Sequence, residues 1–250
     1  MAGRGMEQRV ATRAGEAVRK ARTAPRIDLA RRAEIAAERR RKTRAAILVA
    51  AFRLIGEERG DFQRVEDFCT AAGMARGTFY NYFNSIEQLY EMLADELSRD
   101  FDVAVHRVME TLPTATARTA AAIRYYLRAA MDNPRWGWAM VHTSMGREVF
   151  GPDVSARAKA TIQDGIAANE FTIDNAELGK ALLLGAGLAG ILDIVRGRAR
   201  RNYPEQMARQ ILMGLGLSSS AADTVITERL PALQPVVQGD SAINFWANRG

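Results

Sequence analysis

The spacing of apolar residues predicts a pair of short helices near residue 70. One face of the first helix carries apolar residues at i, i+3, i+4 and i+7, namely Val65, Phe68, Cys69 and Ala72. Gly73 follows, and a tight corner between two helices needs a residue that accepts a positive φ. Phe79 and Phe83 lie one turn apart, so a second helix presents its apolar side to the first. This pattern is typical of a helix-turn-helix that contacts DNA.

The same spacing predicts helices along the rest of the chain. An earlier helix carries apolar residues up to a stop at Gly60: Ile47, Ala50, Ala51, Leu54 and Ile55. Residues 28–42 precede it with four like charges in a row, which favours a frayed extension. Ser85 and Gln88 form a capping box at the start of a long helix that runs to near Pro113 and is roughly 40 Å long. Further helices are predicted at 116–132, 135–146, 153–168, 174–199, 204–215 and 219–230. No strand-like alternation is present, so the predicted fold is all-α.

Charge is unevenly distributed along the 250 residues. The net charge is +6, but residues 1–44 hold 14 Lys or Arg against 5 Asp or Glu. A basic segment beside a helix-turn-helix is suited to contact phosphates, because each neutralised phosphate releases counterions. A solvated tail explains the same charges equally well.

Cysteine content and hydropathy limit the class of protein. Cys69 is the single cysteine, so no internal disulfide forms, and its place on an apolar face indicates a core residue. The longest apolar stretch, 181–192, is too short to span a bilayer, and residues 1–30 contain no secretory apolar run. We therefore expect a cytoplasmic protein.

The segment from Thr43 to Leu89 resembles the TetR family of bacterial regulators. The residues that carry the resemblance are Gly77-Thr78-Phe79-Tyr80-Asn81-Tyr82-Phe83, followed by Ser85-Ile86-Glu87. In that family the run ends a helix-turn-helix DNA-binding core, and a larger helical domain binds an effector and forms the dimer. The resemblance implies that Phe79 and Phe83 are core residues, while the exposed side of the second helix contacts DNA.

The resemblance assigns DNA contacts to eight residues. Arg76 and Gly77 are expected near base edges, Thr78, Tyr80 and Tyr82 at phosphates or thymine methyl groups, and Arg44 and Arg64 at backbone phosphates. Asn81 is the eighth, on the same exposed side.

Three positions depart from the family pattern. Ile86 stands where lysine is usual, Arg64 where threonine is usual, and Ala75 where serine is usual. The family lysine contacts a phosphate, and Ile86 does not supply that contact.

Aromatic and methionine side chains are concentrated in the middle of the chain, where the resemblance implies an effector cavity. The candidate effector residues are Tyr125, Trp136, Trp138, Met140, His142 and Met145. Such side chains suit an apolar or aromatic ligand. They also suit an ordinary core, and His142 suits a hydrogen-bonded core histidine.

Gly185, Gly187 and Gly190 match the spacing of a dinucleotide-binding turn. That turn requires a βαβ unit, whereas the residues on both sides have a helical pattern. Small residues let two helices approach closely, and the resemblance places the last long helices in a dimer interface. The three glycines are therefore candidate dimer contacts.

No arrangement of residues predicts an enzyme, a cofactor or a metal site. His142 with Ser144 lacks the sequence of a nucleophile elbow, and two histidines with one cysteine are too few for a structural zinc site. The sequence indicates a homodimeric, ligand-responsive regulator of palindromic double-stranded DNA, most simply a repressor. Its segments are a flexible basic arm at 1–42, a DNA-binding domain at 43–90, a ligand-binding and dimerisation domain at 91–235, and a tail at 236–250. The alternatives are a ligand-independent architectural DNA-binding protein and a nucleotide-binding enzyme.

Overall fold

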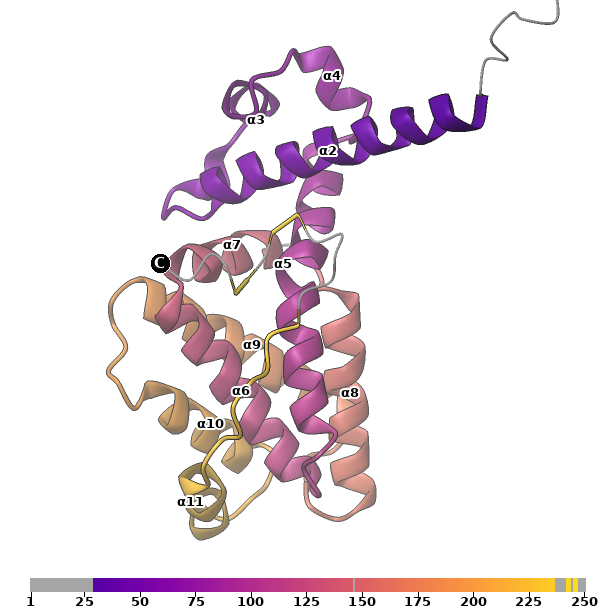
Figure 1. The fold of residues 1–250 in the computed structure, drawn as a ribbon. Coiled ribbons are helices and arrows are strands. Elements are labelled where there is room, and N and C mark those ends of the chain that lie inside the picture. Colours follow the sequence, from indigo (N-terminus) through magenta and orange to yellow (C-terminus); the bar gives the residue numbers. More distant parts are fainter. Residues whose placement is uncertain (1–28, 146, 237–241, 244, 247–250) are drawn as a thin grey trace, which may run out of the picture. The chain divides into compact units, whose positions relative to one another are not determined.

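The computed structural model describes residues 29–145, 147–236, 242, 243, 245 and 246. Within these residues the chain is helical and no strand occurs, so the predicted all-α fold is confirmed (Figure 1). The chain divides into two units, residues 1–42 and 43–250.

The described part of the first unit is helical. Residues 29–42 belong to α2, which spans Leu29–Ile55. The frayed extension favoured by the sequence is therefore not found, and the Ala-, Arg- and Glu-rich composition of this stretch is helix-forming. Glu38 pairs with Arg41 and, at 3.4 Å and i,i+4 spacing, with Lys42. Residues 1–28 of the predicted flexible arm lie outside the described residues.

The second unit begins with the predicted helix-turn-helix. It contains the rest of α2, the 3-10 turn η1 (Gly60–Phe62), α3 (Val65–Ala71) and α4 (Arg76–Tyr80). The corner between α3 and α4 is made by Gly73 at a φ of 65°, as the sequence predicts. Both short helices bury their apolar faces against α2, and the fully buried side chains there include Ile47, Ala51, Ile55, Phe68 and Phe79.

The long helix α5 spans Ile86–Met109. Ser85 caps its N-terminus, with Oγ accepting from the backbone N–H of Gln88 at 3.3 Å, and Gln88 Oε1 accepts from the N–H of Asn84 at 2.6 Å. The predicted apolar side is buried along its whole length: Leu89, Leu93, Leu97, Phe101, Val105 and Val108. One continuous helix therefore begins just after the helix-turn-helix and ends among the following helices.

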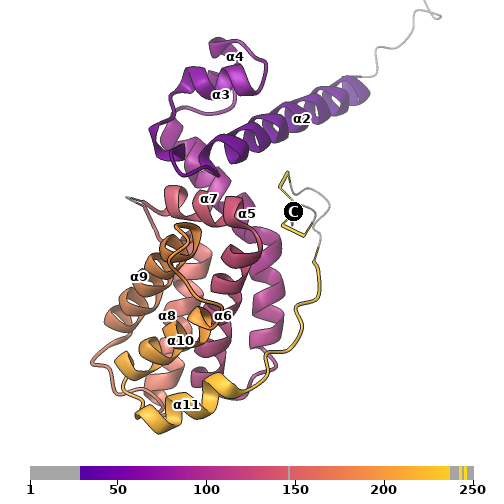
Figure 2. The same ribbon diagram turned by 90° about the vertical axis from the view of Figure 1, so that its left-hand side faces the viewer.

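The remaining helices form a bundle with α5, in which α6 packs against all the others (Figures 1 and 2). They are α6 (Ala115–Asp132), α7 (Pro134–Ser144), α8 (Pro152–Ala167), α9 (Ala176–Val195), α10 (Tyr203–Gly214) and α11 (Ser219–Thr227). Their starts follow the predicted breaks, because Pro134, Pro152 and Pro204 each lie in the first turn of a helix.

Helix α9 is apolar almost all round. In the described part of the chain it is the one helix long and apolar enough to cross a membrane, a property it shares with core helices of soluble proteins. It packs against α6, α7, α8 and α10, which accounts for the apolar residues on its inner side.

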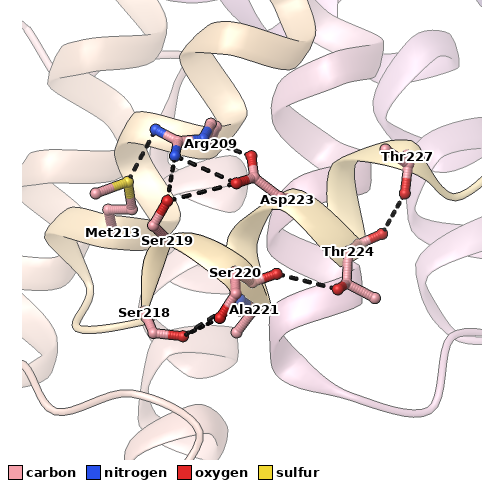
Figure 3. A network of polar contacts seen from close by, with 9 residues as sticks. All are labelled: Arg209, Met213, Ser218, Ser219, Ser220, Ala221, Asp223, Thr224 and Thr227. Atoms are coloured by element: carbon pink, nitrogen blue, oxygen red, sulfur yellow. Dashed lines mark hydrogen bonds and ion pairs between the residues drawn. The ribbon is translucent and has the colours of Figure 1, made fainter.

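A polar network fixes the corner between α10 and α11 (Figure 3). Arg209 Nε lies 2.6 Å from Asp223 Oδ1, and the same guanidinium donates to Ser219 Oγ. Ser218 caps α11 by accepting from the N–H of Ala221 at 3.2 Å. The last two helices are thus held by charge-assisted contacts at the surface as well as by apolar packing.

After α11 the chain leaves the bundle end and follows α6 towards α5 (Figure 1, yellow). We call the described residues 230–236, 242, 243, 245 and 246 the C-terminal segment. Tyr125 Oη donates to the carbonyl of Pro231 at 2.6 Å, and Glu96 accepts from the N–H of Ala242. Phe245 is 2% exposed, and its ring centroid lies 4.6 Å from that of Phe101. The region that the sequence marks as a tail therefore contributes side chains to the core.

Candidate DNA-contacting surface and ligand cavity

Helix α4 separates core residues from exposed residues. Phe79 and Phe83 are 0% and 1% exposed, and their ring centroids are 5.5 Å apart. Tyr80, next to Phe79 in the chain, is 45% exposed. The expectation that the two phenylalanines belong to the core is confirmed.

The predicted base-contacting residues lie at the surface. Arg76 Nη1 lies 2.8 Å from Glu66 Oε1, with both side chains more than half exposed, and its guanidinium sits 5.8 Å from the ring centroid of Tyr80. Both neighbours raise the pKa of Arg76, Tyr80 more than Glu66. An ion pair this exposed is weak, so the guanidinium is available to an outside acceptor.

Packing against the described residues does not require a glycine at position 77. A Cβ at this position would meet nothing within 4 Å, although glycine inside a helix costs up to about 1 kcal/mol relative to alanine. Asn81 is exposed, while Thr78 and Tyr82 are half-buried. The open backbone at Gly77 leaves room for another molecule to approach closely.

The two predicted phosphate-contacting arginines are also exposed. Arg44 lies on α2 with Nη2 3.6 Å from Met92 Sδ. Arg64 precedes α3, and its backbone N–H donates to Asp67 Oδ2 at 2.7 Å. Asp67 therefore closes the first turn of α3 onto the backbone of Arg64, and both arginines lie on the surface of the helix-turn-helix.

Two contacts tie α7 to the end of α2. His142 Nδ1 donates to the carbonyl of Ile55 at 2.7 Å, and Arg135 Nη2 lies 3.1 Å from Glu57 Oε1. Because a carbonyl only accepts, Nδ1 of His142 carries the proton. His142 is 5% exposed and acts as a hydrogen-bonded core histidine.

An apolar cavity of about 60 Å³ lies between α5, α6, α8 and α9. Its apolar lining includes Val105, Met109, Ile123, Phe150, Leu183 and Leu184. The lining residues come from parts of the chain as far apart as Asp102 and Gly187, and α5, which begins just after the helix-turn-helix, contributes one side.

Three polar side chains in the cavity wall bond to one another. Arg157 Nη2 pairs with Asp102 Oδ2, and Tyr126 Oη donates to Asp102 Oδ1 at 3.2 Å. Burial raises the pKa of Tyr126 and lowers the pKa of Arg157. The negative charge of Asp102 is thus balanced by the positive charge of Arg157 within the wall.

Thr119 is the exception in this wall. Its side chain is 1% exposed, and its Oγ1 has no hydrogen-bond partner within the described residues.

None of the six predicted effector residues lines this cavity. Trp136 and Met140 are buried in the core, where Trp136 Nε1 donates to the Leu97 carbonyl at 3.1 Å, and Trp138 stacks on His142. Tyr125 faces the C-terminal segment, and Met145 is 58% exposed. Their neighbours Tyr126 and Phe150 line the cavity instead. The helical spacing in α6 directs Tyr126 into the cavity and Tyr125 away from it. A prediction from aromatic composition alone does not distinguish the two residues.

The three glycines of α9 have different surroundings. A Cβ at Gly187 would lie 3.2 Å from Ile123 Cδ1, and one at Gly190 would lie 2.9 Å from Leu127 Cδ2. Both glycines are buried by α6 of the same chain, which departs from their prediction as dimer contacts. Gly185 is exposed, with nothing within 4 Å of its Cβ position. All three lie inside a continuous helix, so the dinucleotide-binding turn is absent here.

Comparisons with known proteins agree with the geometry. The profile of "Bacterial regulatory proteins, tetR family" matches residues 47–93, and the profile of "Tetracyclin repressor-like, C-terminal domain" matches residues 116–229. Together they cover more than half of the chain. No curated protein matches the chain.

Solved structures show the same fold at low identity. RolR in complex with resorcinol is 22% identical, with a TM-score of 0.62 over 79% of this chain and 100% of its own. FadR from Bacillus subtilis in complex with stearoyl-CoA is 17% identical, with a TM-score of 0.55 over 68% of this chain and 96% of its own. FadR from Bacillus halodurans is 17% identical, with a TM-score of 0.53 over 70% and 95%.

The first profile falls on the helix-turn-helix with the start of α5, and the second falls on the helical bundle that follows. The chain belongs to the TetR family of bacterial transcriptional regulators.

Proposed function

We propose that the protein is a homodimeric, cytoplasmic repressor that binds a palindromic operator and releases it when a small molecule enters the cavity. The observation that supports this most directly is the span of α5. Its N-terminus follows the DNA-contacting turn, and its C-terminal half supplies Asp102, Val105 and Met109 to the cavity wall. One helix therefore connects both sites.

The size of the cavity indicates how a ligand would act on the protein. A ring-sized ligand needs more room than about 60 Å³, because an engineered cavity that binds benzene measures about 150 Å³. Binding therefore displaces side chains between α5 and its neighbours, and close packing passes that displacement along α5. The bonds from α7 to Ile55 and Glu57 are a second connection between the bundle and the DNA-binding part.

The response is a population shift between a DNA-competent and a spread arrangement of the two DNA-binding domains. A ligand that moves the equilibrium from mostly bound to mostly free needs about 10⁴-fold preference for the spread state. RolR and FadR of Bacillus subtilis, which share the fold, each hold a ligand, and this favours a ligand site in the present protein.

The exposed face of α9 supports the dimer. Its outward positions are apolar or small at i, i+3, i+7 and i+11: Leu178, Ala181, Gly185 and Ala189. In the TetR family the last two long helices of each subunit make a four-helix interface, and α9 with α10 occupies that position. The small side chains suit a close approach of two helices.

Selection of binding sites from random double-stranded DNA tests the DNA-binding proposal. We expect an inverted repeat, because the operator of a twofold dimer mirrors its symmetry. Recovery of random sequence, together with a steep dependence of affinity on salt, would instead indicate an architectural DNA-binding protein.

Gly185→Arg tests the dimer. The exposed position accepts the side chain in the monomer, so the melting temperature of the monomer should change little, while sedimentation shows loss of the dimer and operator affinity falls. Ala160→Arg, at an exposed position of α8, is the control and keeps the dimer. An intact Gly185→Arg dimer would exclude this face of α9 as the interface.

A further inference from the structure

The unpartnered Thr119 hydroxyl in the cavity wall differs from the hydroxyls of two other threonines inside helices, Thr143 and Thr70. Thr143 in α7 donates to the carbonyl of Ala139 at 2.8 Å, and Thr70 in α3 donates to that of Glu66 at 2.8 Å. Thr119 in α6 makes no such bond within the described residues, although its side chain is 1% exposed. A buried hydroxyl is nearly always bonded, because leaving it unpaired costs free energy. Thr119 is one of the residues that line the cavity, but its Oγ1 has almost no accessible surface, so a ligand atom reaches it only when neighbouring wall side chains move.

The charged side chains of the cavity wall are already paired with a partner of opposite sign. Both oxygens of Asp102 already accept, one from Tyr126 and one from Arg157. His106 at the edge lies 3.4 Å from Glu110 through Nε2. A ligand charge would lose its hydration and would have to compete with these existing pairs, so an uncharged ligand is favoured.

The rest of the wall suits a ring. Tyr126 and Phe150 lie with ring centroids 5.3 Å apart and planes tilted by 41°, and aliphatic side chains of α5, α6 and α9 face them. Aromatic rings at this separation accept a further ring by edge or offset contact. Because the cavity is already smaller than the space that one ring needs, a ligand of a single ring requires the least displacement of the wall.

We propose that the effector is a neutral, one-ring molecule with a hydroxyl group that hydrogen-bonds to Thr119 Oγ1. The proposal rests on the proposed function, since it names the class of molecule that the same cavity takes.

Calorimetric titration of the purified protein with phenol, toluene and benzoate tests this class. Phenol should bind about tenfold more tightly than toluene, the value of one hydrogen bond in a dry site, and also more tightly than benzoate. In Thr119→Val, which keeps the shape and removes the hydroxyl, the affinity for phenol should fall to that for toluene. Thr143→Val is the matched control, because its hydroxyl bonds to the carbonyl of Ala139, and it should keep the preference for phenol.

Each outcome separates this proposal from the proposed function. Equal binding of phenol and toluene by the wild-type protein, or the same preference in Thr119→Val, overturns the role of the hydroxyl. Tighter binding of benzoate overturns the neutral ligand, and no binding of any of the three overturns the class as a whole. None of these results changes the outcome of the binding-site selection. Only the failure to select an operator motif would contradict a sequence-specific regulator.

Discussion

On the scale of single residues, neighbouring positions of α4 serve different purposes. Phe79 is fully buried, Tyr80 beside it is exposed, and Arg76 and Gly77 lie on the open side. A substitution on one side should therefore change DNA recognition, and one on the other side should change stability.

Arg76→Ala and Phe83→Ala test that division. Arg76→Ala should relax base preference at one half-site position by about 1–3 kcal/mol, with little change in melting temperature. Phe83→Ala removes a side chain that is 1% exposed and should lower the free energy of unfolding by about 3–5 kcal/mol. Binding-site selection and urea unfolding of both variants measure this. Equal loss of folding in the two would contradict the division.

Glu170 carries a pH dependence of stability. Its carboxylate accepts from the N–H groups of Ala115 at 3.2 Å and Thr116 at 2.7 Å, at the N-terminus of α6. Burial alone would raise the pKa of Glu170, but these bonds and Arg118 outweigh it and lower the pKa below 4.5. Because the folded pKa is the lower one, the stabilisation is complete above about pH 4.5 and disappears as the pH falls through the folded value.

Glu170→Gln should therefore cost about 0.3–1 kcal/mol of unfolding free energy at pH 7, as expected for a charge at a helix N-terminus. At pH 3 the gap between wild type and variant should narrow. Urea unfolding at both pH values measures it, with Glu91→Gln, an exposed change in α5, as control. A gap that stays constant or widens on acidification would exclude the charge as its cause.

On the scale of elements, the C-terminal segment packs against three consecutive helices, α5, α6 and α7, that are distant from it in sequence. It bonds to Tyr125 on α6 and Glu96 on α5, and Phe245 packs against Phe101 and Trp136. The residues of the C-terminal segment lie beyond position 229, where the family profile ends.

Phe245→Ala should lower the free energy of unfolding by about 3–5 kcal/mol, the cost of a large core cavity. It should also change the fluorescence of Trp136, whose ring centroid lies 5.5 Å from that of Phe245. Pro235→Ala, at an exposed position of the same segment, should leave both unchanged. Wild-type stability of Phe245→Ala would mean that the segment does not pack.

The elements themselves follow closely from the sequence, because each has a strong local signal. Leu89, Leu93 and Leu97 repeat at helical spacing, and Pro134 and Pro152 fall in the first turns of helices. The cavity has no local signal, since it depends on how four helices meet. The sequence also shows that Gly187 is small without showing that Ile123 fills the space beside it.

On the scale of the whole molecule, charge is concentrated ahead of the DNA-binding domain. Deleting residues 1–42 should weaken binding to all DNA sequences and flatten the salt dependence, by about 0.9 in log K against log salt for each phosphate that is no longer neutralised. Fluorescence anisotropy over a series of salt concentrations measures the slope. A second deletion, of residues 1–28, keeps the helical residues 29–42 and so assigns the effect to one part or the other. An unchanged slope would show that these residues do not contact DNA.

In the proposed mechanism, the small size of the cavity also determines how fast the protein responds to its ligand. Because a ring-sized ligand enters only when side chains between α5 and its neighbours have moved apart, association waits for a rare open state and is slower than the usual encounter of a ligand with a ready-made pocket. The same closure holds a bound ligand in place after its concentration has fallen. A brief pulse of effector would then leave DNA occupancy almost unchanged. A sustained supply would lower DNA occupancy, and the low occupancy would persist for some time after the supply ends.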